Sequence, residues 1–409
     1  MSTSPVRAAL NHWFRRPPRL HGEVDHERTV SFLELLYDLV FVVLISQVAH
    51  TLAAHPSWSG LADFVVVFSL IWIAWLNGSL HHEGHGREDG RGRGNIFGQM
   101  GILVVLAVFT AHATTTDGTN FAVTYTVLLA WIAWQWNTVR YYDVIPMYRR
   151  IAGRYIAMLV VSATLMLASA FIDEWRFVIW VGVAVLNVLV PMLDVRHPLD
   201  RPLGLVPTES MAERFGLLTI ITLGELVVGV VNGINETNRG FVVIGTALLA
   251  LGVGFGFWWN YFDLIGRRPP RATYRAFLPW VLLHLPLTMV IAGAGAGMVG
   301  LIAHASQDHA PAGSGWLLAG SSAALLLLIA LITLLIDYPD EQHRAVMPLA
   351  RRLLSAGVVA SLVVGVLMPA PWLLALLLFL IHAVVWFSLF VALARHTDLF
   401  TRHDGPADA

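Results

Sequence analysis

Twelve long apolar runs constrain the fold of this chain more than any other feature of its sequence. A helix needs about 20 mostly apolar residues to cross a bilayer. Only 13% of the residues are charged, against about 25% in a typical soluble domain. The sequence therefore predicts an all-α, polytopic integral membrane helix bundle and excludes a large soluble catalytic module. The expected spans are 32–54, 61–80, 96–114, 121–140, 154–172, 176–194, 213–233, 239–262, 277–303, 316–337, 352–369 and 371–394.

The arginines test this helix count independently. The chain has 26 basic residues, all of them Arg, and with twelve spans and the N-terminus inside only Arg176 and Arg239 fall on the outer side. Cytoplasmic loops of bacterial membrane proteins collect basic residues. We therefore expect a multi-pass protein of the bacterial inner membrane with both termini in the cytoplasm. The absence of Cys excludes disulfides and thiolate metal sites.

The predicted organisation has two six-helix halves. An internal repeat supports them, because DLVFVV from Asp38 aligns with ELVVGV from Glu225, and WLNGSL after the second span is echoed by WWNYFD in the eighth. Halves with an even number of spans share one orientation, and a site is expected between them. The expected parts are a basic cytoplasmic tail at 1–30, a first half at 31–195, a cytoplasmic linker at 196–212, a second half at 213–395 and a cytoplasmic tail at 396–409.

Two acids in the first span are the strongest functional signal. Glu34 and Asp38 are four residues apart, which places them on one helical face. A carboxylate in hydrocarbon costs about 2.5–3.5 kcal/mol on insertion scales, so such residues normally face a protein interior or water. In the alternative, purely structural role, each acid has one fixed hydrogen-bond partner and only stabilises the packing of the helices. Glu34 could also pair with Arg28 or meet lipid headgroups.

The seventh span carries the best polar stripe. Arg214 and Glu225 are eleven residues apart, which is three helical turns, so they share a face with Thr222. Glu225 would lie about 17 Å along the helix from Arg214, close to mid-membrane. Gly224 and Gly229 would let another helix approach closely. The expected transport or ion pathway therefore consists of Glu34, Asp38, Arg214, Thr222, Glu225 and Asn232.

Weaker candidates lie near span ends or beside prolines. For Gln47 and His50, a capping or interfacial role is at least as plausible as a role in the pathway. Asn77, Asn260 and Asp263 lie at cytoplasmic helix ends and fit helix caps within an aromatic belt. A lone His in a helix is usually a hydrogen-bonded packing residue, but His284, beside Pro286, could line an opening. Pro279, Pro286 and the run GAGAGMVG predict that the ninth span is broken, tilted or closely packed. These secondary candidates are Arg28, Gln47, His50, Asn77, Asn260, Asp263 and His284.

No motif indicates a cofactor or metal. The segment HHEGHGREDGRGRG at 81–94 groups His and acidic residues, but a Gly-rich loop would impose no ligand geometry. There is no H-E-x-x-H helix, P-loop or G-x-S-x-G elbow. We expect no cofactor, no metal and no nucleic acid, with the lipid bilayer and a small ion or small molecule as partners. A homo-oligomer is compatible with the sequence.

With both motifs in hand, the chain resembles the bacterial low temperature requirement A family. That family is marked by E-L-x-x-D-L-V-F in the first helix and by E-R-F-G-L with a later G-E. Here these are Glu34 to Phe41, then Glu213 to Leu217 with Gly224 and Glu225. The resemblance implies a multi-pass bacterial inner-membrane protein named for a growth phenotype in the cold. The chain is also distantly similar to the lysosomal potassium channel family.

The leading functional hypothesis is a transporter or ion-conducting protein that uses intramembrane carboxylates for proton or cation coupling. A carboxylate in a medium of low dielectric binds a proton more readily than in water. An alternative is an intramembrane lipid-modifying enzyme in which the same acids act as general acid or base, although the sequence leans away from an enzyme. Another is a structural or sensory membrane protein required for growth in the cold.

Overall fold

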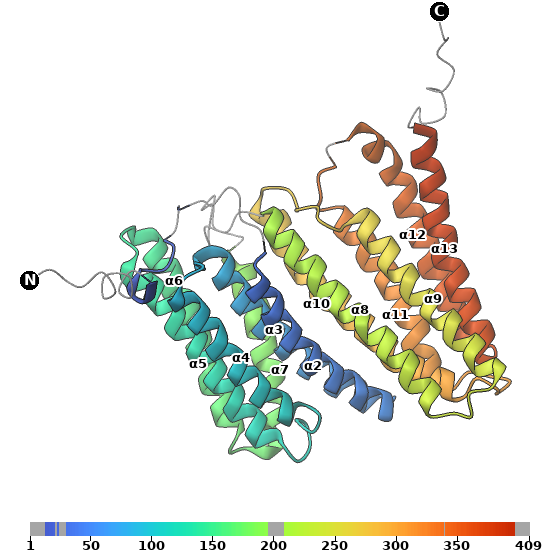
Figure 1. Ribbon diagram of the computed structural model, residues 1–409, viewed down its shortest axis with the longest axis horizontal. Coiled ribbons are helices and arrows are strands. Elements are labelled where there is room, and N and C mark those ends of the chain that lie inside the picture. The colour runs from blue at the N-terminus through green and yellow to red at the C-terminus, as the bar shows by residue number, and fades with distance from the viewer. Residues whose placement is uncertain (1–12, 21–22, 24–29, 195–207, 339, 397–409) are drawn as a thin grey trace, which may run out of the picture. The chain divides into compact units, whose positions relative to one another are not determined.

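The computed structural model describes residues 13–20, 23, 30–194, 208–338 and 340–396. Within them, twelve α-helices follow one another along the chain, with one short 3-10 turn, η1 (Asp173–Trp175), before α7 (Figure 1). The helices are α2 (Phe32–Ala54), α3 (Trp58–His85), α4 (Gly90–Thr110), α5 (Gly118–Tyr142), α6 (Pro146–Ser169), α7 (Arg176–Asp194), α8 (Glu209–Asn235), α9 (Phe241–Leu264), α10 (Tyr274–Ala303), α11 (Ala312–Thr333), α12 (Glu341–Leu367) and α13 (Pro371–His396).

Eleven helical segments in the described residues are long and apolar enough to cross a membrane. They include every expected span except the fourth, at 121–140, which lies within α5. That helix has 25 residues, but Thr, Asn and Gln side chains interrupt its apolar residues. The prediction of an all-α, polytopic helix bundle is confirmed.

The chain divides into two compact units. The first contains residues 1–221 and 272–278, and the second contains 222–271 and 279–409. Of the three divisions along the chain, one falls inside α8 and one inside α10, so these two helices contribute residues to both units. The predicted internal repeat of six-helix halves stays a prediction.

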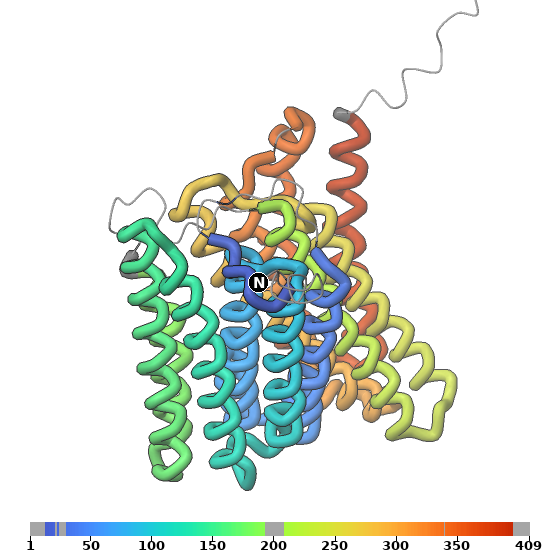
Figure 2. Tube along the Cα trace, turned by 60° about the vertical axis from the view of Figure 1, so that its left-hand side comes forward, coloured from blue at the N-terminus to red at the C-terminus, as the bar shows by residue number. Residues whose placement is uncertain are grey.

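In the first unit, α3 is the helix around which its neighbours are arranged. It contacts α2, α5 and α7, while α4 contacts α2 and α5, and α6 contacts α5 and α7. These helices, blue to green, run side by side in both views (Figures 1 and 2). Lipid tails are as apolar as a helix face, so association in a membrane depends on close packing and polar contacts. α3 supplies both, through buried aromatic rings and buried polar side chains at its C-terminal end.

In the second unit, α9, α11 and α13 contact one another, and α12 contacts α11 and α13. The remainder of α8 packs on α10 at a glycine contact, because a Cβ atom on Gly229 would collide with the Gly295 carbonyl. Gly224, one turn earlier, has no neighbour at its Cβ position. Of the two glycines expected to permit close packing, only Gly229 does so.

Two local expectations are corrected. α10 is one continuous helix through Pro279, Pro286 and the glycine run, so the break expected there is absent and the close-packing alternative holds. The segment 81–94 is not a Gly-rich loop, because α3 continues to His85 and α4 begins at Gly90. The Asp89 carboxylate accepts a hydrogen bond from the Gly92 N–H at 2.7 Å and so caps the first turn of α4, which allows a glycine-rich sequence to start a helix.

Candidate functional site

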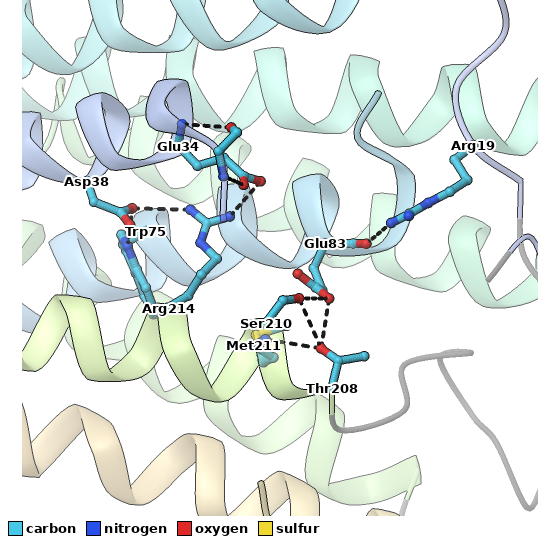
Figure 3. A network of polar contacts seen from close by, with 10 residues as sticks. Arg19, Glu34, Asp38, Trp75, Glu83, Thr208, Ser210, Met211 and Arg214 are labelled. Carbon is cyan, nitrogen blue, oxygen red and sulfur yellow. Dashed lines mark hydrogen bonds and ion pairs between the residues drawn. The ribbon is translucent and has the colours of Figure 1, made fainter. Parts of the chain in front are cut away.

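A buried ion cluster joins α2 and α8 within the first unit (Figure 3). Arg214 Nη2 lies 3.2 Å from Asp38 Oδ1, and Arg214 Nη1 lies 3.5 Å from Glu34 Oε1. The side chains of Arg214 and Asp38 are fully buried and that of Glu34 is nearly so. Three residues of the predicted pathway therefore meet in one place, with one guanidinium between two carboxylates.

The start of α2 positions Glu34. Ser31 and Glu34 form a capping box, in which the Ser31 N–H donates to Glu34 Oε2 at 3.0 Å and the Glu34 N–H donates to Ser31 Oγ at 3.3 Å. One carboxylate oxygen thus satisfies the helix end while the other faces Arg214. Asp38 follows one turn later on the same face.

α3 supplies a third partner for the acids. Trp75 Nε1 donates a hydrogen bond to Asp38 Oδ1 at 2.9 Å, so this oxygen accepts from both Trp75 and Arg214. The ring of Trp75 meets the ring of Phe215 edge to face at 5.1 Å, beside Arg214 on α8. Rigid aromatic packing therefore holds the donor in place.

The cluster contains polar atoms that its own partners do not satisfy. Asp38 Oδ2, Arg214 Nε and the Tyr37 hydroxyl are buried and form no hydrogen bond with the described residues. Buried polar groups normally have a partner. One guanidinium therefore serves two carboxylates in this cluster.

A second set of polar contacts fixes the N-terminus of α8 (Figure 3). Glu83 Oε1 accepts hydrogen bonds from the hydroxyl groups of Thr208 at 2.8 Å and Ser210 at 2.6 Å. Thr208 Oγ1 in turn accepts from the Met211 N–H at 3.1 Å, which caps the helix. A guanidinium nitrogen of Arg19 donates to the Glu83 backbone carbonyl. The end of α3 thereby sets where α8 starts, one turn before Arg214.

A cavity of about 970 Å³ lies at this end of the first unit. Its walls come from the segment before α2, the first turns of α2 and α4, and the last turn of α3, with Gln135 of α5. Glu34 lines the cavity and also contacts Arg214. This residue therefore connects the cavity with the buried ion cluster.

The remaining pathway candidates lie further along α8. Thr222 and Glu225 are buried and Asn232 is half-buried, and all three belong to the second unit. The Cβ position of Gly295 on α10 lies 2.8 Å from the Glu225 backbone carbonyl, so the two helices also pack closely at this level. The predicted pairing of Asp38 with Glu225 stays a prediction.

Of the secondary candidates in the first unit, Asn77 is the most engaged. It is buried, donates to the Ile73 carbonyl at 2.8 Å and accepts from the Tyr155 hydroxyl. Gln47 is half-buried and His50 is exposed near the end of α2, while Arg28 lies outside the described residues.

The secondary candidates of the second unit also have structural partners. Asn260 donates to the Gly256 carbonyl at 2.8 Å, and Trp386 donates to the exposed Asp263 at 2.7 Å. The buried His284 has Trp280 O at 2.7 Å from Nδ1 and the Tyr261 hydroxyl at 3.1 Å from Nε2. His284 is thus a packed, hydrogen-bonded residue, which is the usual role of a lone His in a helix.

Several residues of the site were missed from the sequence. The capping box was readable, since Ser31 and Glu34 have the S-x-x-E spacing that precedes an apolar run. Thr208 and Ser210 just before an apolar run are similarly an N-terminal helix signal. Trp75 as a donor to Asp38 has no local signal, because its partner is 37 positions away.

Comparison with known proteins identifies relatives across most of the chain. Residues 29–391 match the sequence profile of a family described as bacterial low temperature requirement A protein. An uncharacterized protein of Rhizobium meliloti (strain 1021), RA0937, is 26% identical over 274 residues, which is 61% of this chain and 61% of that protein. The chain thus matches under two thirds of that relative's length.

Proposed function

Because the chain belongs to the bacterial low temperature requirement A family and carries eleven described helical segments able to span a membrane, we propose that it is a transporter or ion-conducting protein. In this proposal buried carboxylates couple the movement of a solute to protons or cations. The protein would lie in the bacterial inner membrane with both termini in the cytoplasm, as the distribution of its arginines favours.

The observation that carries the proposal is that Glu34 belongs both to the wall of the cavity and to the buried ion cluster. It lines the cavity and is an ion-pair partner of Arg214, which also pairs with Asp38. A proton or cation arriving in the cavity can thus reach a carboxylate whose charge is felt by the buried pair. When Glu34 is neutralised, Arg214 interacts mainly with Asp38; when the charge is released, the triad is restored.

Charge balance gives this exchange its driving force. A buried charge without compensation is strongly destabilising. In the proposal, the acid that takes up a proton or a cation leaves Arg214 to the other acid. Because Glu34 and Asp38 share the same Arg, a change on one acid alters the balance at the other. That dependence is the property a coupled carrier requires.

The polar face of α8 would extend the pathway. Thr222, Glu225 and Asn232 follow Arg214 at helical spacings that place them on the same side of one helix. Intramembrane acids are by default functional candidates, and Glu225 is buried. In the proposal Glu225 is the second acid that a moving ion meets.

Flux through sealed liposomes tests the proposal. The purified protein is reconstituted with an internal pH-sensitive dye, and proton entry is followed under a potassium diffusion potential, with Na⁺ and K⁺ gradients as separate arms. Wild-type flux should exceed that of protein-free liposomes, and Glu34→Gln, Asp38→Asn and Glu225→Gln should abolish it. Glu236→Gln, on an exposed residue beyond α8, is the matched control. Wild-type rates in all three acid variants would remove the proposal.

A structural role is the second candidate, and the burial of Asp38 favours it. Its Oδ1 atom already has two donors, Trp75 and Arg214, which is how a helix-locking acid would be held. The two functions separate in paired measurements. A structural role predicts that Asp38→Asn lowers thermal stability while any flux per folded molecule is unchanged, whereas coupling predicts lost flux in protein that still folds.

A further inference from the structure

We propose that the cavity at the α2–α3–α4 end of the first unit binds the phosphate group of an anionic phospholipid. This inference is independent of transport, because it concerns the walls of the cavity and not the ion cluster behind Glu34. The cavity, about 970 Å³, is as large as the pockets that hold small ligands in proteins.

The charge of the walls favours an anion. Five Arg residues line the cavity, and three acids face them: Glu34, Glu88 and Asp89. Two of these acids are engaged, since Glu34 contacts Arg214 and Asp89 caps α4. The lining Arg residues are Arg16, Arg19, Arg87, Arg91 and Arg93.

Arg16, Arg91 and Arg93 are the residues best placed to meet a phosphate. Arg87 forms an ion pair with Glu23, which compensates its charge. Arg91 donates to the Arg16 backbone carbonyl at 3.3 Å, and the Arg93 guanidinium lies 5.5 Å from the centre of the Trp13 ring. These partners are neutral, so the positive charges of Arg91 and Arg93 remain available to an anion.

The start of α4 adds to this attraction. Arg91 and Arg93 lie in its first turn, and Asp89, Arg91, Gly92 and Arg93 all line the cavity. The N-terminus of a helix carries a partial positive charge and attracts phosphate groups. The helix end and the arginines therefore act on the same space.

The apolar part of the wall favours a lipid over a soluble phosphate. Phe32 and Phe97 line the same cavity and are 90% and 77% exposed, and Leu36 is also exposed. Phe32 and Leu36 lie at the start of α2, and Phe97 lies about two turns into α4. Both helices are long and apolar enough to span a membrane. Large apolar side chains beside arginines at the start of a span match a headgroup with its acyl chains alongside.

Lipid retention by the full-length protein tests the site. Delipidated protein in mild detergent is titrated with phosphatidylglycerol or with phosphatidylcholine of the same acyl chains, and bound lipid is counted by native mass spectrometry. The variant is Arg91→Gln with Arg93→Gln. The matched control is Arg149→Gln with Arg150→Gln, which removes two exposed arginines from the first turn of α6 outside the cavity. Inorganic phosphate is added in a separate competition arm.

We expect wild-type protein to prefer phosphatidylglycerol, and the Arg91/Arg93 variant to bind it roughly ten- to thirtyfold more weakly. The control should keep the preference. Displacement by millimolar inorganic phosphate, dependent on the same arginines, would show that the phosphate alone is recognised; no displacement would show that the lipid is required. Both results support the phosphate site.

Two results would overturn the site: no headgroup preference in the wild type, or equal loss in the control and in the Arg91/Arg93 variant. If the double variant does not fold, Arg16→Gln decides the question. Arg16 is exposed and contacts Arg91 through its backbone carbonyl, so the substitution should leave folding intact. A several-fold weaker binding of phosphatidylglycerol supports the site, and unchanged binding contradicts it.

Discussion

The Arg214 guanidinium on α8 lies 3.2 Å from Oδ1 of Asp38 on α2, and both side chains are completely buried. The two residues are 176 positions apart in the sequence. Their ion pair joins the start of α8 to the first predicted span within the first unit. Since the same guanidinium also contacts Glu34, removal of Arg214 leaves two buried acids without their shared cation.

Arg214→Gln should therefore lower the free energy of unfolding by about 3–5 kcal/mol, the usual consequence of leaving a buried charge unpaired. Denaturant or thermal unfolding of the purified protein in detergent measures the change, with the exposed Arg149→Gln as control. Adding Asp38→Asn to Arg214→Gln should restore part of the loss, because the buried charge that Arg214 compensated at Asp38 is then absent. Simple addition of the two single losses would show that the residues do not interact.

Trp75→Phe should destabilise the protein by about 1.5–3 kcal/mol, since it removes a hydrogen bond to an ionised group while keeping an aromatic ring. Trp72→Phe is the control: Trp72 lies on the same helix and also packs on Phe215, but its Nε1 has no hydrogen-bond partner among the described residues. The difference between the two variants in the same unfolding measurement isolates the bond to Asp38. Equal losses would mean that only ring volume matters.

The sequence predicted the fold well because its main signal, apolar length, acts locally. Each of the twelve expected spans lies largely within one α-helix. The errors concern where helices break and begin, which depends on contacts with other residues. Prolines at 279 and 286 fit inside α10, and Asp89 starts α4 earlier than the apolar residues alone indicated.

For the site, the sequence located Glu34, Asp38 and Arg214 but not their contact. Acidic residues within an apolar run can be recognised in a sequence. Their partner Arg214 is 176 positions from Asp38 and 180 from Glu34, and no local sequence pattern indicates such a contact. The cavity was also not predictable, because residues from before α2 and from α2 to α5 enclose it together. Three of its arginines, Arg87, Arg91 and Arg93, indicated only a cytoplasmic side.

Thr208→Val should lower the free energy of unfolding by about 1 kcal/mol or more, because it removes both the cap of α8 and a hydrogen bond to Glu83. Thr208→Ser keeps the hydroxyl group and is the matched control. Hydrogen exchange at the first turn of α8 should increase in the Val variant alone. If both variants behave alike, the hydroxyl does not fix the start of α8.

Gly229→Ala should destabilise the second unit by about 1–3 kcal/mol, because the new methyl group would meet the Gly295 backbone carbonyl, which cannot rotate away as a side chain could. Gly224→Ala offers a control on the same helix, since nothing lies within 4 Å of its Cβ position. There the lower entropy of the unfolded chain should make the change neutral or stabilising by about 0.5–1 kcal/mol. Thermal unfolding of the two variants should therefore shift in opposite directions or leave only Gly229→Ala impaired. If Gly229→Ala were as stable as Gly224→Ala, α8 and α10 would not be in backbone contact at this glycine pair.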